Sequence, residues 1–377
     1  MSWCELPADL VSGIADRITE HADLARFRSV CPSWRSASAA HAARRRVPLL
    51  LVPSQFRVNR RLWSLVDDSV VEVPFPEARG FSFLYASPRG WTLGVSSSRG
   101  LSATLLHPFT GASESLPALP PCFADEDQRI LRNMVWDRSP DAVVVSPRKG
   151  GALFCRLRPV VDASWSPVTG CCSSQDGRTS SIAYCDGTFY LLDGRARRVT
   201  AVDGATFAVA AVIEPPPPRM VKPRLPGCEP ESTLIASPGE LLLLVRTRLL
   251  IEEGSYYNSN RMFKVFRADH RNLAAGWSDV TDGRGGIGDR AVFVDHLRGF
   301  LVEANGVNGV KRNSMYVASA HTVVDDDYGM DVYANYTVSV LDLTDLTTED
   351  LYYGNLVRKC RDGSLWQWPS WFMPNLY

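Results

Sequence analysis

The sequence predicts an α+β multidomain fold, in which a small unit of three helices precedes a mostly-β domain arranged as a β-propeller. Apolar residues recur at helical spacing within positions 1–46, the predicted first domain. From Val47 onward, short apolar runs are broken by Gly, Pro, Asp and Asn, which is typical of antiparallel strands. These runs recur in weakly similar units through the second domain, 47–377, and such repetition favours a propeller.

The first helix is expected to begin at Pro7, because a proline lacks the N–H that would stay unpaired in a first helical turn. Apolar residues then follow at helical spacing: Leu10, Val11, Ile14, Ala15 and Ile18.

Two further short helices are expected. Asp23 can cap the second, whose apolar positions are Leu24, Phe27 and Val30. Pro32 can open the third, which carries Trp34 and leads into a run of small residues at 37–43.

These helices carry more apolar surface than so small a unit can bury. A unit of about 40 residues usually needs a metal, disulfides or a partner, and its sequence has neither metal-ligand spacing nor paired cysteines. We therefore expect an obligate partner. The alternative is an ordinary helical cap that packs on the following domain.

The order of several short motifs in this unit resembles the F-box. The motifs are Leu6-Pro7-x-Asp9-Leu10, Ile14, Ile18, Asp23-Leu24, Phe27-Arg28-x-Val30-Cys31 and Ser33-Trp34-Arg35. F-box helices dock into an apolar groove of the Skp adaptor of a cullin-RING ubiquitin ligase. The resemblance implies a set of adaptor contacts or their immediate supports: Leu6, Pro7, Leu10, Ile14, Leu24, Val30, Cys31 and Trp34.

Composition narrows the possible classes of protein. Lys and Arg number 41, as do Asp and Glu, so the net charge of zero argues against a strongly basic nucleic-acid surface. The apolar runs are far shorter than the roughly 20 residues of a membrane helix, and no secretory signal is evident at the N-terminus. We expect a cytoplasmic or nuclear protein. Its nine cysteines lack C-x-x-C spacing, which favours reduced thiols.

Five units of the second domain share a pattern of strand, tight turn, strand and further strand. They span residues 81–111, 141–165, 181–202, 233–277 and 291–343. The third is the clearest, because Asp186-Gly187 between alternating strands is a strong hairpin signal. The segment 47–74 and the tail complete a further blade or close the ring, so the number of blades stays open. The alternative fold is a large irregular β-sandwich.

Motifs along the second domain resemble a plant F-box family whose C-terminal domain of unknown function is described as a propeller. They are Leu106-x-Pro108-Phe109-Thr110-Gly111, Ile182-x-Tyr184-x-Asp186-Gly187-x-Phe189-Tyr190, Ser237-Pro238-Gly239-Glu240-Leu241-Leu242, Phe263-x-Val265 with Trp277, Gly288-Asp289-x-Ala291-x-Phe293, and Trp371-Phe372-x-Pro374.

No catalytic, metal or cofactor site is predicted. The segment 283–288 satisfies G-x-G-x-x-G, but a dinucleotide site needs a helix after it and a strand is expected there. The six histidines lie singly.

The sequence therefore predicts a non-catalytic substrate-recognition subunit of an SCF (Skp-cullin-F-box) E3 ubiquitin ligase. Its second domain would recruit an unknown protein through residues that the sequence does not identify. The alternative is a propeller enzyme, or a small-molecule-binding or scaffold protein, that carries an F-box for adaptor binding or its own turnover.

Overall fold

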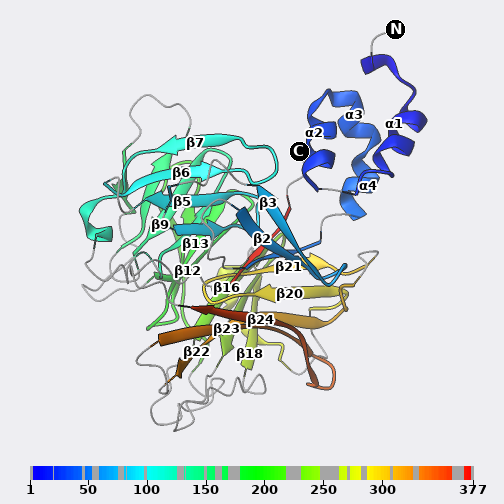
Figure 1. Ribbon diagram of the computed structural model, residues 1–377. Helices are drawn as coiled ribbons and strands as arrows, with labels where there is room; N and C mark the ends of the chain where they lie inside the picture. Colours follow the sequence, from blue (N-terminus) through cyan, green and yellow to red (C-terminus); the bar gives the residue numbers. More distant parts are fainter. Residues whose placement is uncertain are drawn as a thin grey trace.

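The computed structural model describes most of the chain. The described residues are 3–19, 21–44, 47–52, 59–74, 80–81, 83–96, 100–124, 131, 133–147, 151–157, 164–168, 179–217, 231–246, 263–269, 272–281, 287–305, 309–325, 331–358 and 369–374. They form a group of helices beside a six-bladed β-propeller (Figure 1).

The helical unit contains four α-helices where the sequence predicts three. They are α1 (Ala8–Ala15), α2 (His21–Ser29), α3 (Pro32–Ala37) and α4 (Ala39–Arg44), preceded by the 3-10 turn η1 (Trp3–Glu5). Pro7 lies one residue before α1, as its N-cap, and its carbonyl accepts the N–H of Val11 at 3.1 Å. Helix α1 ends at Ala15, so the predicted helical position Ile18 lies beyond it. The Ile18 N–H donates to the Ala15 carbonyl, three residues earlier in the chain.

The second helix begins earlier than predicted. Asp23 lies in the first turn of α2 rather than at its cap, and its carboxylate pairs with Arg26 at 2.9 Å. Helix α3 opens with Pro32, as predicted. The run of small residues is then interrupted at Ser38, whose hydroxyl donates to the Trp34 carbonyl at 2.7 Å, and α4 starts at the next residue.

Six antiparallel or mixed sheets form the blades, numbered here from 1 to 6 in chain order. Blade 1 contains β1 (Leu49–Val52), β2 (Asn59–Ser64), β3 (Ser69–Pro74) and β25 (Ser370–Phe372), and blade 2 contains β4 (Phe83–Ala86), β5 (Thr92–Ser96), β6 (Ser102–Leu106) and β7 (Ser113–Leu116). Blade 3 contains β8 (Val135–Arg138), β9 (Ala142–Ser146), β10 (Leu153–Arg156) and β11 (Ser166–Pro167), and blade 4 contains β12 (Thr179–Cys185), β13 (Thr188–Asp193), β14 (Val199–Asp203) and β15 (Val209–Ile213).

Blade 5 contains β16 (Glu231–Ser237), β17 (Glu240–Arg246), β18 (Phe263–Asp269) and β19 (Ser278–Asp279), and blade 6 contains β20 (Arg290–Val294), β21 (Gly299–Glu303), β22 (Ser314–Asp325), β23 (Asp331–Asp342) and β24 (Thr348–Arg358). Short 3-10 turns, η4 (Pro121–Phe123) and η7 (Leu273–Ala275), lie between strands. The predicted propeller class is thus confirmed, and the β-sandwich alternative is wrong.

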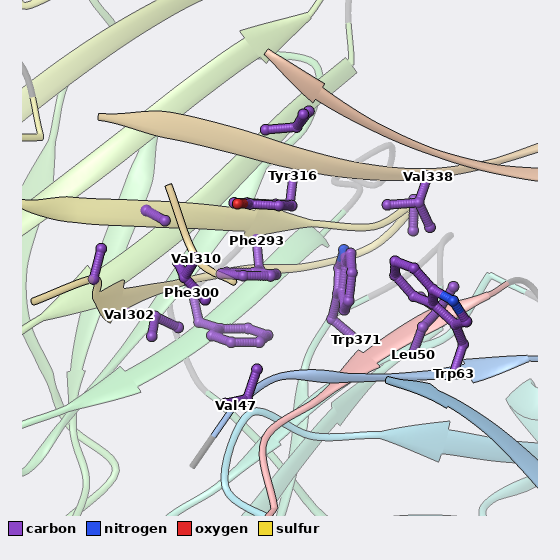
Figure 2. Close-up of a cluster of buried hydrophobic side chains, with 14 of the residues drawn as sticks. Val47, Leu50, Trp63, Phe293, Phe300, Val302, Val310, Tyr316, Val338 and Trp371 are labelled. Atoms are coloured by element: carbon purple, nitrogen blue, oxygen red, sulfur yellow. The ribbon is translucent and has the colours of Figure 1, made fainter. Parts of the chain in front are cut away.

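The two ends of the propeller meet in blade 1, which answers the open question of blade number. Strand β25 pairs with β1, with Trp371 opposite Leu50, so the tail and the first strands share one sheet. Figure 2 shows Trp371 between Phe293 of blade 6 and Trp63 of blade 1. The Trp371 ring lies edge-on to Phe293, with centroids 4.9 Å apart.

Blade 6 departs from the simple hairpin pattern of the other blades. Strand β21 is at the inner edge of this sheet and β20 pairs in parallel with β22, so the chain crosses over between them. Close packing against blade 5 requires Gly299, because a Cβ at this position would lie 2.8 Å from Ile235.

The clearest predicted hairpin is confirmed. Asp186 and Gly187 have φ angles of 46° and 82°, as a type I′ turn between β12 and β13 requires. The predicted units miss several strands of blades 2–6, namely β7, β8, β11, β15, β19 and β24. The segment after the glycine-rich run is strand β20, as predicted. Residues 283–286 of that run lie outside the described residues, as do Trp366 and Trp368 of the tail.

Candidate functional site

The helical unit has a small core of its own. Val11 and Ala15 of α1 pack with Phe27 of α2, and Leu6 and Trp34 lie partly buried against them. The rings of Phe27 and Trp34 have centroids 4.5 Å apart. These contacts use the side of α1 that faces the other helices.

Arg28 joins helices α2 and α3. Its guanidinium donates to the Arg35 carbonyl at 2.9 Å and to the Ser38 hydroxyl at 3.0 Å, and Arg35 in turn donates to the Arg28 carbonyl at 3.3 Å. The Arg28 side chain is buried. A buried guanidinium needs such acceptors to offset its lost hydration, so Arg28 fixes the angle between the two helices.

A second surface of the helical unit packs on the propeller. Leu24 is buried in a cluster that includes Leu49 and Leu51 of β1, Phe109 after β6, and Phe372 of β25. The His21 ring also stacks on Phe109, with centroids 5.6 Å apart. The helices are therefore attached to blades 1 and 2 by side-chain packing as well as by the chain itself.

A third part of the helical unit is apolar and exposed. Among the described residues, half of the large apolar side chains that are exposed belong to residues 3–30. They are Trp3 at 73%, Leu10 at 54%, Ile14 at 42% and Val30 at 53% exposed, named here the exposed apolar set. Leu10 and Ile14 are one helical turn apart, so they share one side of α1.

The predicted adaptor-binding residues fall into three groups. Leu10, Ile14 and Val30 are exposed, as is Pro7, and these four can reach a partner. Leu6, Trp34 and Cys31 are partly buried, and the first two support α1 and α2 from within.

Leu24 is different, because it contacts the propeller and only 1% of its surface is exposed. It can support the position of α2 but has almost no surface for a partner.

The inner edge of the propeller contains a buried polar network. The Asp137 carboxylate, at the end of β8, accepts the backbone N–H of Tyr184 in blade 4 at 2.8 Å and faces Arg89 of blade 2 at 3.7 Å. The Arg89 guanidinium also donates to the Tyr184 carbonyl. Burial raises the pKa of the Asp137 carboxyl above its ordinary value, although Arg89 opposes the shift. Asp137 thus connects three neighbouring blades.

Blade 6 contributes the other half of this network. One Asp295 oxygen accepts the backbone N–H groups of Leu297 and Arg298, each at 2.8 Å, and the other accepts that of Trp371 at 3.2 Å. The Arg298 guanidinium lies over the Trp136 ring of blade 3, 5.0 Å from its centroid. Since blades 3 and 6 lie on opposite sides of the ring, this contact spans the propeller axis.

Burial has the largest effect on the pKa values of Asp295 and Arg298 in blade 6. It lowers the pKa of the Arg298 guanidinium and raises that of the Asp295 carboxyl, while the attraction between the two charges opposes both shifts. The contacts of Asp137 and Asp295 are mainly with backbone N–H groups and arginines, which suits a structural role for both carboxyls.

Comparison with known proteins assigns the family of this chain. The family model described as the KIB1-4 beta-propeller matches residues 62–336, which is more than two thirds of the chain. The chain belongs to the KIB1-4 beta-propeller family. The matched segment begins within β2, so the helical unit lies outside it.

Two curated relatives of this KIB1-4 beta-propeller chain come from Arabidopsis thaliana. The putative F-box protein At5g66830 is 21% identical over 351 residues, covering 86% of this chain and 84% of the relative. The F-box protein At2g17036 is 24% identical over 337 residues, and the aligned region covers 78% of this chain and 77% of the relative. These findings confirm the resemblance to plant F-box proteins with a propeller domain.

The N-terminal domain of Nup159 is a solved structure that aligns with this KIB1-4 beta-propeller chain. The aligned region covers 80% of this chain and 71% of that domain. The TM-score is only 0.33 and the identity 9%, too low to establish a common fold.

Within the described residues, no helix has the length and apolar character to cross a membrane. No cluster of three or more His, Cys, Asp or Glu side chains suited to a metal ion occurs in that part of the chain either.

Sequence reasoning missed two features of this KIB1-4 beta-propeller protein. Trp3 precedes the first recognisable motif, and its signal is a large aromatic residue three positions before Leu6-Pro7. The Asp137 and Arg298 network was also missed. A charged residue beside a buried strand, as in Val135-Trp136-Asp137, is the signal that could have indicated it.

Proposed function

We propose that this protein is the substrate-recognition subunit of an SCF-type E3 ubiquitin ligase. Residues 1–46 would act as the F-box that binds the Skp adaptor, and residues 47–377 would recruit a protein for ubiquitination, in the cytosol or nucleus. The exposed apolar set carries this proposal. Four large apolar side chains on so short a helical unit lose favourable burial unless a partner covers them.

The arrangement of the helical unit suits a helix-in-groove contact. Leu10 and Ile14 project from one side of α1, whereas Val11 and Ala15 on its other side hold the helix in place. The names of the two Arabidopsis relatives support the same role.

The role of the propeller would be positioning rather than side-chain chemistry. A protein held on the propeller and an E2 enzyme held through the adaptor react at a high effective concentration. Since α2 packs directly on blades 1 and 2, the propeller would be held at one orientation relative to the adaptor.

The test is co-purification from plant cells of the intact protein and of a Leu10→Asp/Val30→Asp variant. Both positions are about half exposed, so the substitutions should preserve the fold. We expect recovery of Skp and cullin to fall at least about tenfold, because desolvating a carboxylate in an apolar contact costs more than the ~1.4 kcal/mol that a factor of ten requires.

Val212→Asp is the matched control. Val212 is 48% exposed on β15 of blade 4, outside the helical unit, and its replacement should leave Skp recovery unchanged. Equal recovery of Skp with the intact protein and the double variant would refute the F-box role.

A further inference from the structure

Two cysteines meet within the helical unit. Cys4 lies in the exposed turn η1, and Cys31 is the N-cap of α3. The Trp34 indole donates to the Trp3 carbonyl at 3.0 Å and so holds η1 beside the start of α3. In this arrangement the Cys4 side chain lies within hydrogen-bonding reach of Cys31, and neither cysteine is part of a disulfide.

Cys31 also differs chemically from three described cysteines of the propeller, Cys122, Cys155 and Cys185. The Trp34 backbone N–H and the Cys4 thiol stabilise its thiolate, which lowers the pKa of the Cys31 thiol. Burial instead raises the pKa of Cys122 and of Cys155, and it raises that of Cys185 to about 11. Thiolate content controls nucleophilicity, so Cys31 is the more reactive thiol near neutral pH.

We propose that Cys4 and Cys31 are a redox modification site, at which a reversible disulfide ties η1 to the start of α3. Each residue alone would be an ordinary surface thiol. The pair becomes a site because the fold places a reactive thiol and a resolving thiol in contact, on the part of the helical unit that also contains Trp3 and Val30.

The oxidant would be a peroxide. The Cys31 thiolate attacks one peroxide oxygen and breaks the O–O bond, which gives a sulfenic acid on Cys31 and releases water after proton uptake. The Cys4 thiol then attacks the Cys31 sulfur, forms the S–S bond and expels the sulfenic oxygen as a second water. Two thiols and one hydrogen peroxide thus yield one disulfide and two waters, with the sulfurs oxidised and the peroxide reduced.

This modification would act on the proposed adaptor surface, and that consequence rests on the proposed function. A disulfide brings the two sulfurs to about 2.05 Å. It would therefore pull η1 onto Cys31, beside the exposed Val30, and fix it there. A partner groove that must close over this segment would be obstructed, so the oxidised protein should bind the adaptor more weakly.

The first experiment tests the bond itself. Full-length protein is treated with hydrogen peroxide, alkylated, digested without reductant and analysed by mass spectrometry. We expect one linked peptide pair that contains Cys4 and Cys31, lacks two hydrogens and disappears with dithiothreitol. Cys4→Ser and Cys31→Ser should each abolish it.

Cys122→Ser should retain the linked pair, because Cys122 is an exposed cysteine elsewhere in the chain. Conversion of Cys31 to sulfinic acid in the intact protein, or linkage only between separate molecules, would overturn the proposal.

The second experiment measures adaptor affinity for the reduced and the peroxide-treated protein. We expect oxidation to weaken binding of the Skp adaptor at least tenfold and dithiothreitol to restore it, while the affinity of Cys31→Ser, which lacks the peroxide-reactive thiol, stays the same before and after peroxide. Equal affinity of both forms would refute the regulatory role and leave the F-box role intact. Failure of the reduced protein to bind would refute the F-box role, while the mass spectrum would still decide the existence of the disulfide.

Discussion

At the scale of single residues, the ionisable groups near the propeller axis connect blades that are distant in sequence. Asp137 accepts the Tyr184 N–H of blade 4, and Asp295 accepts the Trp371 N–H of blade 1. Between them, Arg298 lies over Trp136. Each contact satisfies a buried polar group and at the same time fixes the position of one blade against another.

The raised pKa of Asp137 leads to a prediction about pH. In the native state its carboxyl takes up a proton at a higher pH than in the unfolded chain, whose value is about 3.9. Protonation of Asp137 therefore favours the folded state. The stabilisation that it contributes is fully present at pH values below the unfolded pKa, and it is lost as the pH rises through the folded pKa. The free energy of unfolding of the intact protein, relative to Asp137→Asn, should rise on acidification from neutral pH to about pH 4.

The control for this prediction is Asp203→Asn. Hydrogen bonds from Thr206 lower the pKa of Asp203, so its contribution is present above the unfolded value and is lost as the pH falls. Urea unfolding at several pH values should give opposite slopes for the two variants relative to the intact protein. A difference for Asp137→Asn that stays flat or decreases on acidification would contradict the prediction.

At the scale of secondary-structure elements, the short strand β25 closes the propeller. It contributes only Ser370–Phe372, yet Trp371 and Phe372 are both buried. The Trp371 indole donates to the Val294 carbonyl of blade 6 at 3.1 Å, and its backbone pairs with β1. This strand thereby joins the first and last blades, so the stability of the ring depends on a few side chains.

We expect Trp371→Ala to lower the free energy of unfolding by about 3–5 kcal/mol, as is usual for a buried tryptophan. Trp371→Phe should cost less, because it keeps an aromatic ring beside Phe293 and loses mainly the bond to the Val294 carbonyl. Urea unfolding followed by far-ultraviolet circular dichroism, which reports on the backbone, measures both variants. A loss for Trp371→Ala below about 1 kcal/mol would show that β25 does not close the ring energetically.

At the scale of the whole molecule, the sequence predicted those features that depend on local pattern. The hairpin at Asp186-Gly187 and the helix that opens at Pro32 follow from turn and cap chemistry. The parallel pairing of β20 with β22 and the pairing of β25 with β1 join distant segments. No local spacing specifies such partners, so the number of blades could not be predicted.

The same distinction applies to the candidate site. Leu10 and Leu24 are chemically identical and both lie in short helices, yet one is half exposed and the other buried. The difference arises because Leu24 meets Leu49 and Phe109, which are brought to it by the fold of blades 1 and 2. The sequence thus predicted which residues are apolar in the helical unit, and tertiary packing determines which of them a partner can reach.

This packing predicts that the helical unit and blade 1 are stabilised together. Leu24→Ala should lower the free energy of unfolding by about 2–5 kcal/mol, because it leaves a cavity in the cluster shared by α2, β1 and β25. Amide hydrogen exchange should increase in the described helices and also in β1. Leu10→Ala, the matched change at an exposed leucine of the same unit, should alter stability by no more than about 0.5 kcal/mol. Faster exchange in the helices alone would mean that the two units fold independently. The orientation of the propeller relative to the helical unit would then be set by the connecting chain instead of by side-chain packing.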